Sequence, residues 1–394
     1  MINIESNKEK ISDILTRGVE EVIDKDILEK KLLSGKKLRV KLGIDPTSPN
    51  IHIGRSIPLL KLKDFQELGH TVVFIIGDST GIIGDTSDKE SERPMLSKEI
   101  VQNNLQTYIE QAAKIIDVEK AEIYHNSEWL DKLTYQEIGR QAGVFSLNSF
   151  IMRENIRRRL DDGKRVSLRE LLYPLMQGYD SVKVKADVEI GGTDQRFNLL
   201  AGRDLQREYG QEPQDVITNP LLEGLDGRKM SSSWGNTVNL LDTPNDMFGK
   251  IMSLKDEFII RYFTFATRVP TEVINTYSDA LKAKSNPRDI KMRLAYELVR
   301  MYNSENMAKQ AQEFFVNTFS KKEIPDVVPE IKPSSYDVIT VMVESGLSPS
   351  KSEARRLIEH KGVKINEAVM DDPKKVLKKD DIVQKGKRFF VKVI

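Results

Sequence analysis

Apolar and polar residues alternate along the first part of the chain in a pattern that predicts strands joined by helices. Leu38–Ile44 and Thr71–Ile76 are apolar runs of strand length. Between them, apolar residues recur at roughly helical spacing from Ile57 to Leu68, and Gly69 can end this helix. A strand, a helix and a buried strand in succession are typical of a βαβ unit, so we expect an α/β fold with a parallel sheet covered on both faces.

Further along the chain, the pattern becomes helical. Residues 97–117 are expected to form one long amphipathic helix, and Val184–Ile190 another strand that ends in Gly191–Gly192. From Asn245 to about Lys322, apolar positions recur at helical spacing with few strand signals. The chain therefore combines an α/β part with an α-helical part.

Three prolines set the last part of the chain apart. Pro325, Pro329 and Pro333 fix their own φ and restrict the residues before them, which predicts an extended linker. We divide the chain into an α/β domain with an insertion at residues 1–244, a helical domain at 245–324, the linker at 325–335 and a small α+β module at 336–394.

Composition and charge change this picture mainly by what they exclude. Among 394 residues, 61 are Lys or Arg and 60 are Asp or Glu, so the net charge is +1 and nucleic acid must be held by local patches. Residues 333–394 contain 13 basic and 9 acidic side chains, a net of +4, which leaves −3 for the rest. The absence of cysteine excludes disulfides, thiolate nucleophiles and Cys-ligated zinc, and four dispersed histidines suggest no metal site. With no secretory signal and no membrane-spanning run, we expect a cytoplasmic protein without a membrane partner.

The loop after the first predicted strand is a candidate phosphate site. Residues 45–55 read DPTSPNIHIGR and lead into a helix, whose N-terminus attracts phosphate. His52 and Arg55 can donate to phosphate oxygens, and Gly54 lets a base approach the backbone closely. From the residues alone, a rigid loop in which His52 only caps or packs explains the pattern equally well. Neither GxxxxGK nor GxGxxG occurs, which disfavours a P-loop NTPase and an ordinary dinucleotide dehydrogenase.

A second candidate lies in residues 226–236, DGRKMSSSWGN. Its three serines supply short donors and its small side chains leave backbone N–H groups accessible to a phosphate chain. Lys229 adds a point charge, and Gly227 and Gly235 allow the loop to move. The alternative is an ordinary surface loop, where serine clusters are common.

A third candidate is one face of a predicted helix. Tyr173, Gln177 and Asp180 are spaced i, i+4, i+7 and share that face, where they can bind a polar ligand with an ammonium group and a hydroxyl. A partly exposed helix face is the commoner explanation of such a triplet. Asp85 and the GGTDQ turn at 191–195 can likewise be a cap and a tight strand end.

Together these segments resemble the signature motifs of one family. HIGR resembles the HIGH motif and KMSSS the KMSKS loop of class I aminoacyl-tRNA synthetases, in the DPTxxxxHIG context of the tyrosyl-tRNA synthetases. LYPLMQGYD resembles the tyrosine-binding helix of that family, and GGTDQ its ribose-contacting turn. The resemblance covers essentially the whole chain. It implies a Rossmann-like catalytic domain with a helical insertion, then a helical domain and a small RNA-binding module.

The resemblance assigns roles residue by residue. His52, Arg55 and Lys229 are expected to be catalytic. The residues expected to bind ATP are Asp45, Thr47, His52, Gly54, Arg55, Gly192, Asp194, Lys229, Met230, Ser231, Ser232 and Ser233. The residues expected to bind tyrosine are Lys41, Asp85, Tyr173, Gln177, Asp180 and Gln195. Among these, Tyr173 and Gln177 are assigned to the α-amino group, with Asp85 nearby, and Asp180 to the phenolic hydroxyl.

Three positions depart from the family pattern. Arg55 replaces the usual last histidine of HIGH; arginine is longer and always charged, so its contact with ATP is expected to differ. Ser232 replaces the second lysine of KMSKS, so only Lys229 is carried over as a transition-state contact. Lys41 stands where many members have a tyrosine that touches the substrate hydroxyl, so Asp180 is expected to carry more of the discrimination.

Two segments are candidates for RNA contact. Residues 346–366 resemble the small module shared by a ribosomal protein of the small subunit and bacterial tyrosyl-tRNA synthetases, with Lys351, Arg355 and Arg356 directed at phosphates. An inert basic domain is the alternative. Residues 153–169 are also rich in arginine, although a charge run is usually a solvated helix face.

The resemblance implies a tyrosine–tRNA ligase that activates tyrosine with ATP and magnesium and transfers it to tRNA(Tyr), as a homodimer. A tryptophanyl enzyme of similar fold is the nearest alternative, against which Asp180 and the terminal module argue. The others are an amino-acid-activating paralogue that no longer charges tRNA, prompted by Arg55 and Ser232, and a non-catalytic RNA-binding protein on the same scaffold.

Overall fold

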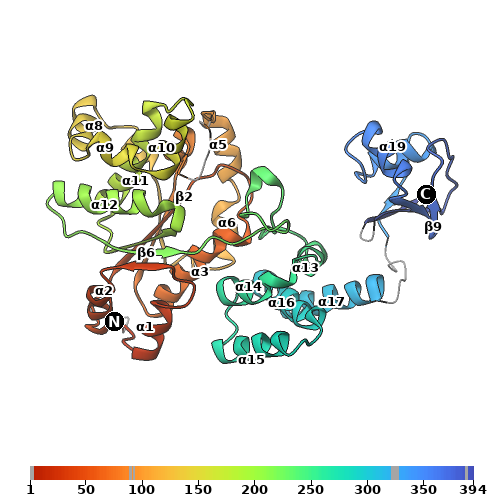
Figure 1. Cartoon of the computed structure of the whole chain (residues 1–394), viewed down its shortest axis with the longest axis horizontal. Helices are drawn as coiled ribbons and strands as arrows, with labels where there is room; N and C mark the ends of the chain where they lie inside the picture. Colours follow the sequence, from red (N-terminus) through yellow and green to blue (C-terminus); the bar gives the residue numbers. More distant parts are fainter. Residues whose placement is uncertain (1–3, 88–90, 92–93, 321–327, 387–388) are drawn as a thin grey trace.

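The sheet predicted from the apolar runs is the centre of the computed structural model (Figure 1), which describes residues 4–87, 91, 94–320, 328–386 and 389–394. Its strand order is β1-β6-β5-β2-β3-β4. The strands are β1 (Glu21–Ile23), β2 (Arg39–Ile44), β3 (Thr71–Ile76), β4 (Glu122–His125), β5 (Val188–Gly192) and β6 (Asp215–Asn219). Strands β2 to β6 run parallel, and β1 joins the edge antiparallel to β6. The carboxyl ends of the parallel strands, including β2, β3, β4 and β5, therefore lie on the same side of the sheet. Ligands of such sheets bind there.

Helices cover both faces of this sheet and form the insertion between β4 and β5 (Figure 1). They are α1 (Lys8–Ile14), α2 (Lys25–Leu33), α3 (Ile53–Glu67), α4 (Asp78–Ile83), α5 (Lys98–Leu105), α6 (Tyr108–Ala113), α7 (Ser127–Leu130), α8 (Tyr135–Ala142), α9 (Leu147–Ile151), α10 (Glu154–Asp161), α11 (Leu168–Val184) and α12 (Arg196–Glu208). Helix α11 begins at a capping box, in which Ser167 and Glu170 satisfy each other's backbone N–H groups. This start fixes the register of the face that carries the predicted pocket.

Two predicted elements differ from the structure. The single helix expected over 97–117 is interrupted at Thr107, whose hydroxyl accepts from Gln111 and donates to the carbonyl of Pro49. The strand expected from Val184 begins only at Val188, because α11 continues to Val184 and ends at Lys185 in the left-handed conformation. In the first place a contact with the distant Pro49 overrides the local apolar pattern, and in the second the helix extends into the run predicted as a strand.

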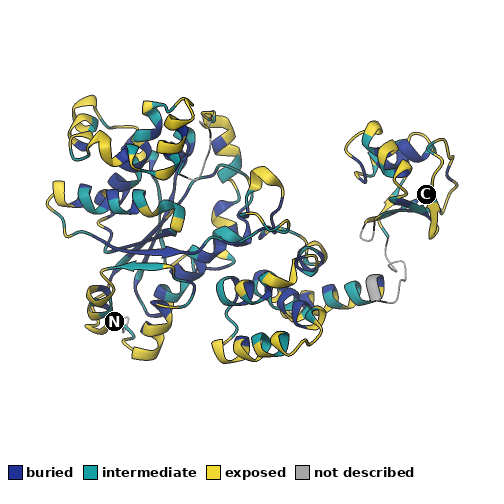
Figure 2. Ribbon diagram, in the orientation of Figure 1, coloured by how far each residue is buried: buried dark blue, intermediate teal, exposed yellow. Residues whose placement is uncertain are grey.

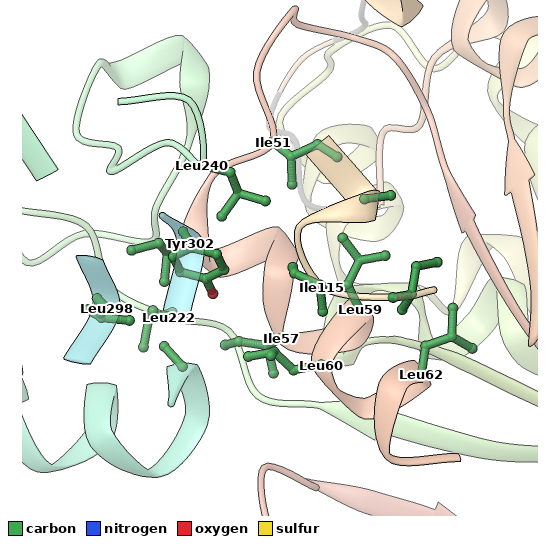
Figure 3. Packing of buried hydrophobic residues seen from close by; sticks show 14 of the residues in the cluster. Ile51, Ile57, Leu59, Leu60, Leu62, Ile115, Leu222, Leu240, Leu298 and Tyr302 are labelled. Carbon is green, nitrogen blue, oxygen red and sulfur yellow. The ribbon is translucent and has the colours of Figure 1, made fainter. Parts of the chain in front are cut away.

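The helical domain shares a continuous core with the first domain. It contains α13 (Pro244–Met252), α14 (Ile259–Ala266), α15 (Thr271–Lys282), α16 (Pro287–Tyr302) and α17 (Glu305–Ser320). Figure 3 shows Leu298 and Tyr302 of α16 near Ile57 and Leu60 of α3, and all four are buried in one cluster. The hydroxyls of Ser56 and Tyr302 are 2.8 Å apart. The helix that follows the HIGR loop is therefore fixed on both sides.

The C-terminal module has a core of its own, built from residues such as Val338, Met342, Ile358 and Val383 (Figure 2). Its elements are β7 (Glu330–Ile331), α18 (Val338–Glu344), α19 (Lys351–Glu359), β8 (Val363–Ile365), β9 (Ala368–Met370), β10 (Ile382–Lys385) and β11 (Phe389–Val393). Because β7 pairs with β11, this sheet already includes residues that we assign to the linker; the start of that linker lies outside the described residues. Within the described ranges, no helix is long and apolar enough to span a membrane.

Candidate active site

The candidate site is a cavity of about 240 Å³ at the carboxyl ends of the central strands. Strand β2 pairs with β3 on one side and with β5 on the other, so the chain leaves it at a point where the strand order changes direction. The loops after β2, β3 and β5, the face of α11 and the serine-rich loop line the cavity. Segments far apart in the sequence thus meet around one space.

The structure brings nearly all the predicted residues to this cavity. Those that line it are Asp45, Thr47, His52, Gly54, Arg55, Asp85, Tyr173, Gln177, Asp180, Gly192, Asp194, Gln195, Lys229, Met230, Ser231, Ser232 and Ser233. Lys41 does not line it. The interpretations of the two loops as isolated surface features are therefore disfavoured, since both face the same hollow.

His52 begins α3 as its N-cap, and its Nδ1 accepts a hydrogen bond from the backbone N–H of Arg55 at 3.3 Å. The pKa of His52 is lowered to about 3. Burial is the main cause, and the nearby charges of Arg55 and Lys229 act in the same direction. The imidazole is therefore neutral at physiological pH, and its Nε2–H is the donor left for a ligand. His52 thus offers a hydrogen bond without a positive charge, unlike Arg55.

Arg55 and Lys229 hold the positive charge of the site. The guanidinium of Arg55 donates to the carbonyl of Asp45 at 3.2 Å, to Thr47 Oγ1 at 3.1 Å and to the Tyr108 hydroxyl at 3.4 Å. Lys229 Nζ lies 2.9 Å from Asp194 Oδ2. Arg55 thus braces the loop after β2, whereas Lys229 reaches from the serine-rich loop to the turn after β5.

The serine-rich loop lies directly on the start of α3. The backbone N–H of Gly54 donates to Met230 Sδ at 3.4 Å, and the hydroxyls of Ser48 and Ser232 are 3.2 Å apart. A Cβ at Gly54 would approach the His52 ring to 3.1 Å, so glycine lets the loop and the imidazole lie this close. The two signature segments therefore form one wall.

At the other end of the cavity, a carboxylate is held in a fixed orientation. Asp180 accepts from Trp129 Nε1 at 2.8 Å and from Asn126 Nδ2 at 3.2 Å. Burial raises the pKa of Asp180 to about 7, and Lys41, Trp129 and Asn126 act in the opposite direction. Asn126 and Trp129 were not among the predicted residues; they lie just after strand β4.

Two more carboxylates lie at the edge of the same space. The Tyr173 hydroxyl donates to Asp45 Oδ2 at 2.9 Å, so the side chain of Asp45 faces α11 rather than the helix start where ATP phosphates were expected. Burial raises the pKa of Asp45 to about 6. Asp85 accepts from Gln195 Nε2 at 2.5 Å and from the Ser87 hydroxyl at 2.6 Å. These carboxylates make this end of the cavity suited to a cation.

The assignment of Lys41 to the amino-acid ligand requires correction. Its side chain is fully buried and forms an ion pair with Glu189 at 2.8 Å, on the far side of the residues that line the cavity. Side chains alternate between the two faces of a strand, and this register turns Lys41 toward the underside of α11. Lys41 is therefore beneath the site and not in it.

Comparison with known proteins agrees with this geometry. A family model described as tRNA synthetases class I (W and Y) matches residues 33–320. The chain belongs to this family. An S4 domain model also matches residues 338–383 of the synthetase.

The curated relatives of this synthetase match it along nearly its whole length. The tyrosine–tRNA ligase of Thermotoga maritima is 46% identical, with 96% of each chain covered. That of Haemophilus influenzae is 44% identical over 96% of this chain and 95% of its own. Among solved structures, the Coccidioides posadasii mitochondrial tyrosyl-tRNA synthetase, C-terminally truncated, has a TM-score of 0.63 at 25% identity, covering 77% of this chain and 91% of its own. The tyrosyl-tRNA synthetase of Archaeoglobus fulgidus shares the fold, with a TM-score of 0.62 at 22% identity. The match covers 78% of this chain and 100% of the other.

In the C-terminal module of the synthetase, α19 presents a basic face. Lys351, Arg355 and Arg356 are exposed, whereas Ala354 and Ile358 of the same helix are buried. Arg356 pairs with Glu353 at 2.8 Å, which leaves Lys351 and Arg355 as the stronger candidates for phosphate contact.

The arginine-rich segment at 153–169 is less available to RNA than its sequence suggests. Arg159 is buried against Glu170, and Arg153 stacks over the Phe197 ring at 4.6 Å while donating to Ser87. Part of this segment therefore serves the structure of the synthetase through a buried ion pair, which differs from the solvated helix face considered in the sequence analysis.

The raised pKa of Asp180 predicts that tyrosine binds more weakly in acid. If the phenolic hydroxyl donates to the Asp180 carboxylate as the sequence predicts, affinity falls as Asp180 takes up its proton below pH 7. We expect the Kd for tyrosine to be about tenfold higher at pH 6 than at pH 8. Calorimetric titration with tyrosine across this range is the measurement. A matched Asp180→Asn protein should lose most of this slope, and an unchanged slope would assign the titration to Asp45.

Arg55→His is expected to keep activity. Histidine in the first turn of α3 still offers a donor to the nucleotide, while the contacts of Arg55 with Asp45 and Thr47 are lost. We expect pyrophosphate exchange within about tenfold of the unmodified synthetase, because only a brace and part of one charge are removed. A loss of exchange rate as large as that expected from removing a transition-state contact would contradict this prediction.

Proposed function

We propose that this synthetase is a tyrosine–tRNA ligase. It activates tyrosine with ATP to tyrosyl-adenylate and pyrophosphate, and then transfers the tyrosyl group to the 3′-terminal ribose of tRNA(Tyr). One observation carries the proposal: a single cavity holds the nucleotide loops with His52 and Lys229 at one end and the buried carboxylate Asp180 at the other. A tyrosine with its hydroxyl at Asp180 has its own carboxylate directed toward the nucleotide end.

In the first step, an oxygen of the tyrosine carboxylate attacks the α-phosphorus of ATP in line. The new carboxylate–phosphorus bond forms as the bond to the pyrophosphate oxygen breaks, so the substrate is its own nucleophile and no protein nucleophile is required. The protein positions both reactants and places donors where negative charge builds up. Lys229 and Arg55 supply charge, and the neutral His52 supplies a hydrogen bond from Nε2. In the second step, the ribose hydroxyl of tRNA displaces AMP from the tyrosyl carbonyl.

Magnesium belongs to the proposal as a partner of the nucleotide. Within the described ranges, no three His, Asp or Glu side chains come together as a metal site. The proposal places the ion on the phosphate oxygens of ATP, where it would neutralise charge on the pyrophosphate. Lys229 and the serine-rich loop are the protein groups that would face this complex.

The C-terminal module supports tRNA as the second substrate. Its exposed Lys351 and Arg355 lie on one helix, and phosphate contacts of this kind give affinity that falls steeply with salt. The S4 domain match covers the same helix. We also place the protein in the cytoplasm, where its tRNA partner is used.

A homodimer is part of the proposal as well. Large apolar side chains are exposed on the insertion helices α8 to α11, namely Tyr135, Leu147, Met152, Leu160 and Leu168. An apolar surface of this kind favours association with a second copy. Since one chain is 45.0 kDa, a species of about 90 kDa (2 × 45.0) is expected in light scattering. Leu147→Asp combined with Met152→Asp should shift it to the mass of one chain.

The experiment that tests the proposed activity is ATP–pyrophosphate exchange followed by tRNA charging. We expect exchange with tyrosine, little with tryptophan or phenylalanine, and tyrosylation of tRNA. Exchange with tryptophan instead would favour a tryptophanyl enzyme. Exchange without charging would indicate an activating paralogue, and tRNA binding without exchange would indicate a non-catalytic scaffold.

A further inference from the structure

A buried ion pair lies directly beneath the amino-acid end of the cavity. Lys41 of β2 and Glu189 of β5 are partners across the parallel strands, and their side chains are 0% and 1% exposed. Lys41 Nζ is 2.8 Å from Glu189 Oε1. Burying two charges is unfavourable unless their remaining hydrogen-bonding positions are satisfied, so the neighbours of this pair are informative.

Those neighbours belong mainly to α11, the helix that carries the amino-acid pocket. Lys41 Nζ donates to the carbonyl of Gln177 at 2.9 Å and to Ser181 Oγ at 2.8 Å, which with Glu189 uses all three ammonium hydrogens. Glu189 accepts from Gln177 Nε2 at 3.1 Å, from Ser181 Oγ at 3.0 Å and from Gln214 Nε2. The pair therefore fixes α11 to the sheet at the turn that holds Gln177.

The contact with the side-chain amide of Gln177 has a chemical consequence. An amide has one donating and one accepting end, and a carboxylate such as Glu189 can only accept. The nitrogen of Gln177 is thus directed down to Glu189, and we infer that its oxygen is the end of the amide left for a ligand in the cavity that Gln177 lines. An ammonium group needs an acceptor, so only this orientation suits an amino acid.

We propose that Lys41 and Glu189 are positioning residues that hold the Gln177 amide with its oxygen toward the ammonium group of the amino-acid substrate. This inference rests on the proposed function. Glu189 sets the orientation of the amide, and Lys41 makes the charge of Glu189 tolerable at complete burial. Neither residue touches the substrate.

The variant that tests this role removes both charges at once. In Lys41→Met/Glu189→Gln, residue 189 offers one acceptor and a donating NH₂ instead of two acceptors, so the Gln177 amide is free to flip. Removing the pair together also limits the change of field at Asp180, because Lys41 lowers the pKa of Asp180 and Glu189 raises it by a smaller amount. The matched control is Lys61→Met/Asp64→Asn. Lys61 is 3% exposed, pairs with Asp64 and donates to the carbonyl of Ile14, away from the cavity.

Two ligands distinguish positioning from general damage. Tyrosine has the ammonium group, and 3-(4-hydroxyphenyl)propionate lacks it but is otherwise the same. By calorimetry at pH 8, we expect the double variant to bind tyrosine about tenfold more weakly, as for one charge-assisted hydrogen bond, and the propionate within about twofold of the unmodified protein. In exchange assays the KM for tyrosine should rise while the KM for ATP does not. The control variant should bind both ligands with the same affinity as the unmodified protein.

Equal losses for both ligands, or no loss for tyrosine, would overturn the inference. If the double variant does not fold, Glu189→Gln alone, which preserves side-chain volume, is expected to give the same difference between ligands. If the unmodified protein fails to bind tyrosine, the proposed function fails with it. If the unmodified protein binds tyrosine and the variant binds it equally well, only the positioning role fails.

Discussion

Lys229→Ala is expected to reduce the rate of tyrosine-dependent pyrophosphate exchange by about 100- to 1,000-fold, the usual cost of one preorganised transition-state contact. Lys229 is the lysine that the serine-rich loop brings to the cavity, and Ser232 stands where the family has another. The loss should appear in kcat, with the KM for tyrosine little changed, since Lys229 lies at the nucleotide end.

Arg228→Ala is the matched control for this prediction. Arg228 precedes Lys229 in the same loop, but its guanidinium stacks over the Trp234 ring at 4.6 Å and pairs with Asp226, away from the cavity lining. We expect exchange within about threefold of the unmodified enzyme, because no transition-state contact is removed. An unaffected Lys229→Ala enzyme would remove the role assigned to this loop.

Asp180→Asn is expected to raise the KM for tyrosine by about 100-fold and to reduce the preference for tyrosine over phenylalanine by a similar factor. The substitution replaces a charged acceptor of the phenolic hydroxyl by a neutral amide, and hydrogen bonds to charged groups are worth about 1.5–3 kcal/mol. The KM for ATP should stay within about twofold, because the substitution lies at the opposite end of the cavity.

Asp78→Asn is the control for Asp180→Asn. It separates loss of the expected contact with the phenolic hydroxyl from a general loss of stability. Asp78 is also buried, and its carboxylate accepts from the hydroxyl and backbone N–H of Ser127 without lining the cavity. Its substitution should lower the melting temperature but leave the ratio of tyrosine to phenylalanine exchange unchanged. If both variants change this ratio equally, Asp180 has no special role in recognising the hydroxyl.

Short-range patterns in the sequence were sufficient to predict much of the fold. The boundaries expected for Thr71–Ile76 are those of β3, and the helical face of Tyr173, Gln177 and Asp180 lies on α11 as expected. Both signature loops meet at the sheet edge where parallel strands end. These features follow from local periodicity together with a general rule about where α/β sheets bind ligands.

What the sequence could not predict depends on long-range register. Whether Lys41 faces the cavity is decided by which way β2 turns its alternate side chains, and a change of one position reverses the answer. Asn126 and Trp129 reach Asp180 only because β4 lies beside β3, which local periodicity does not reveal. The neutral state of His52 likewise depends on burial by distant residues.

The ion pair with Asp194 neutralises the charge of Lys229 when no ligand is bound. A phosphate or sulfate ion would have to separate these partners in return for a single new contact. Under the proposed function, ATP is expected to bring phosphates for the lysine and a ribose for the aspartate in one molecule, so both partners would be replaced together. Under the proposed function, only a ligand that carries both phosphate and ribose replaces both partners of this ion pair, so we expect small inorganic anions to compete weakly with ATP.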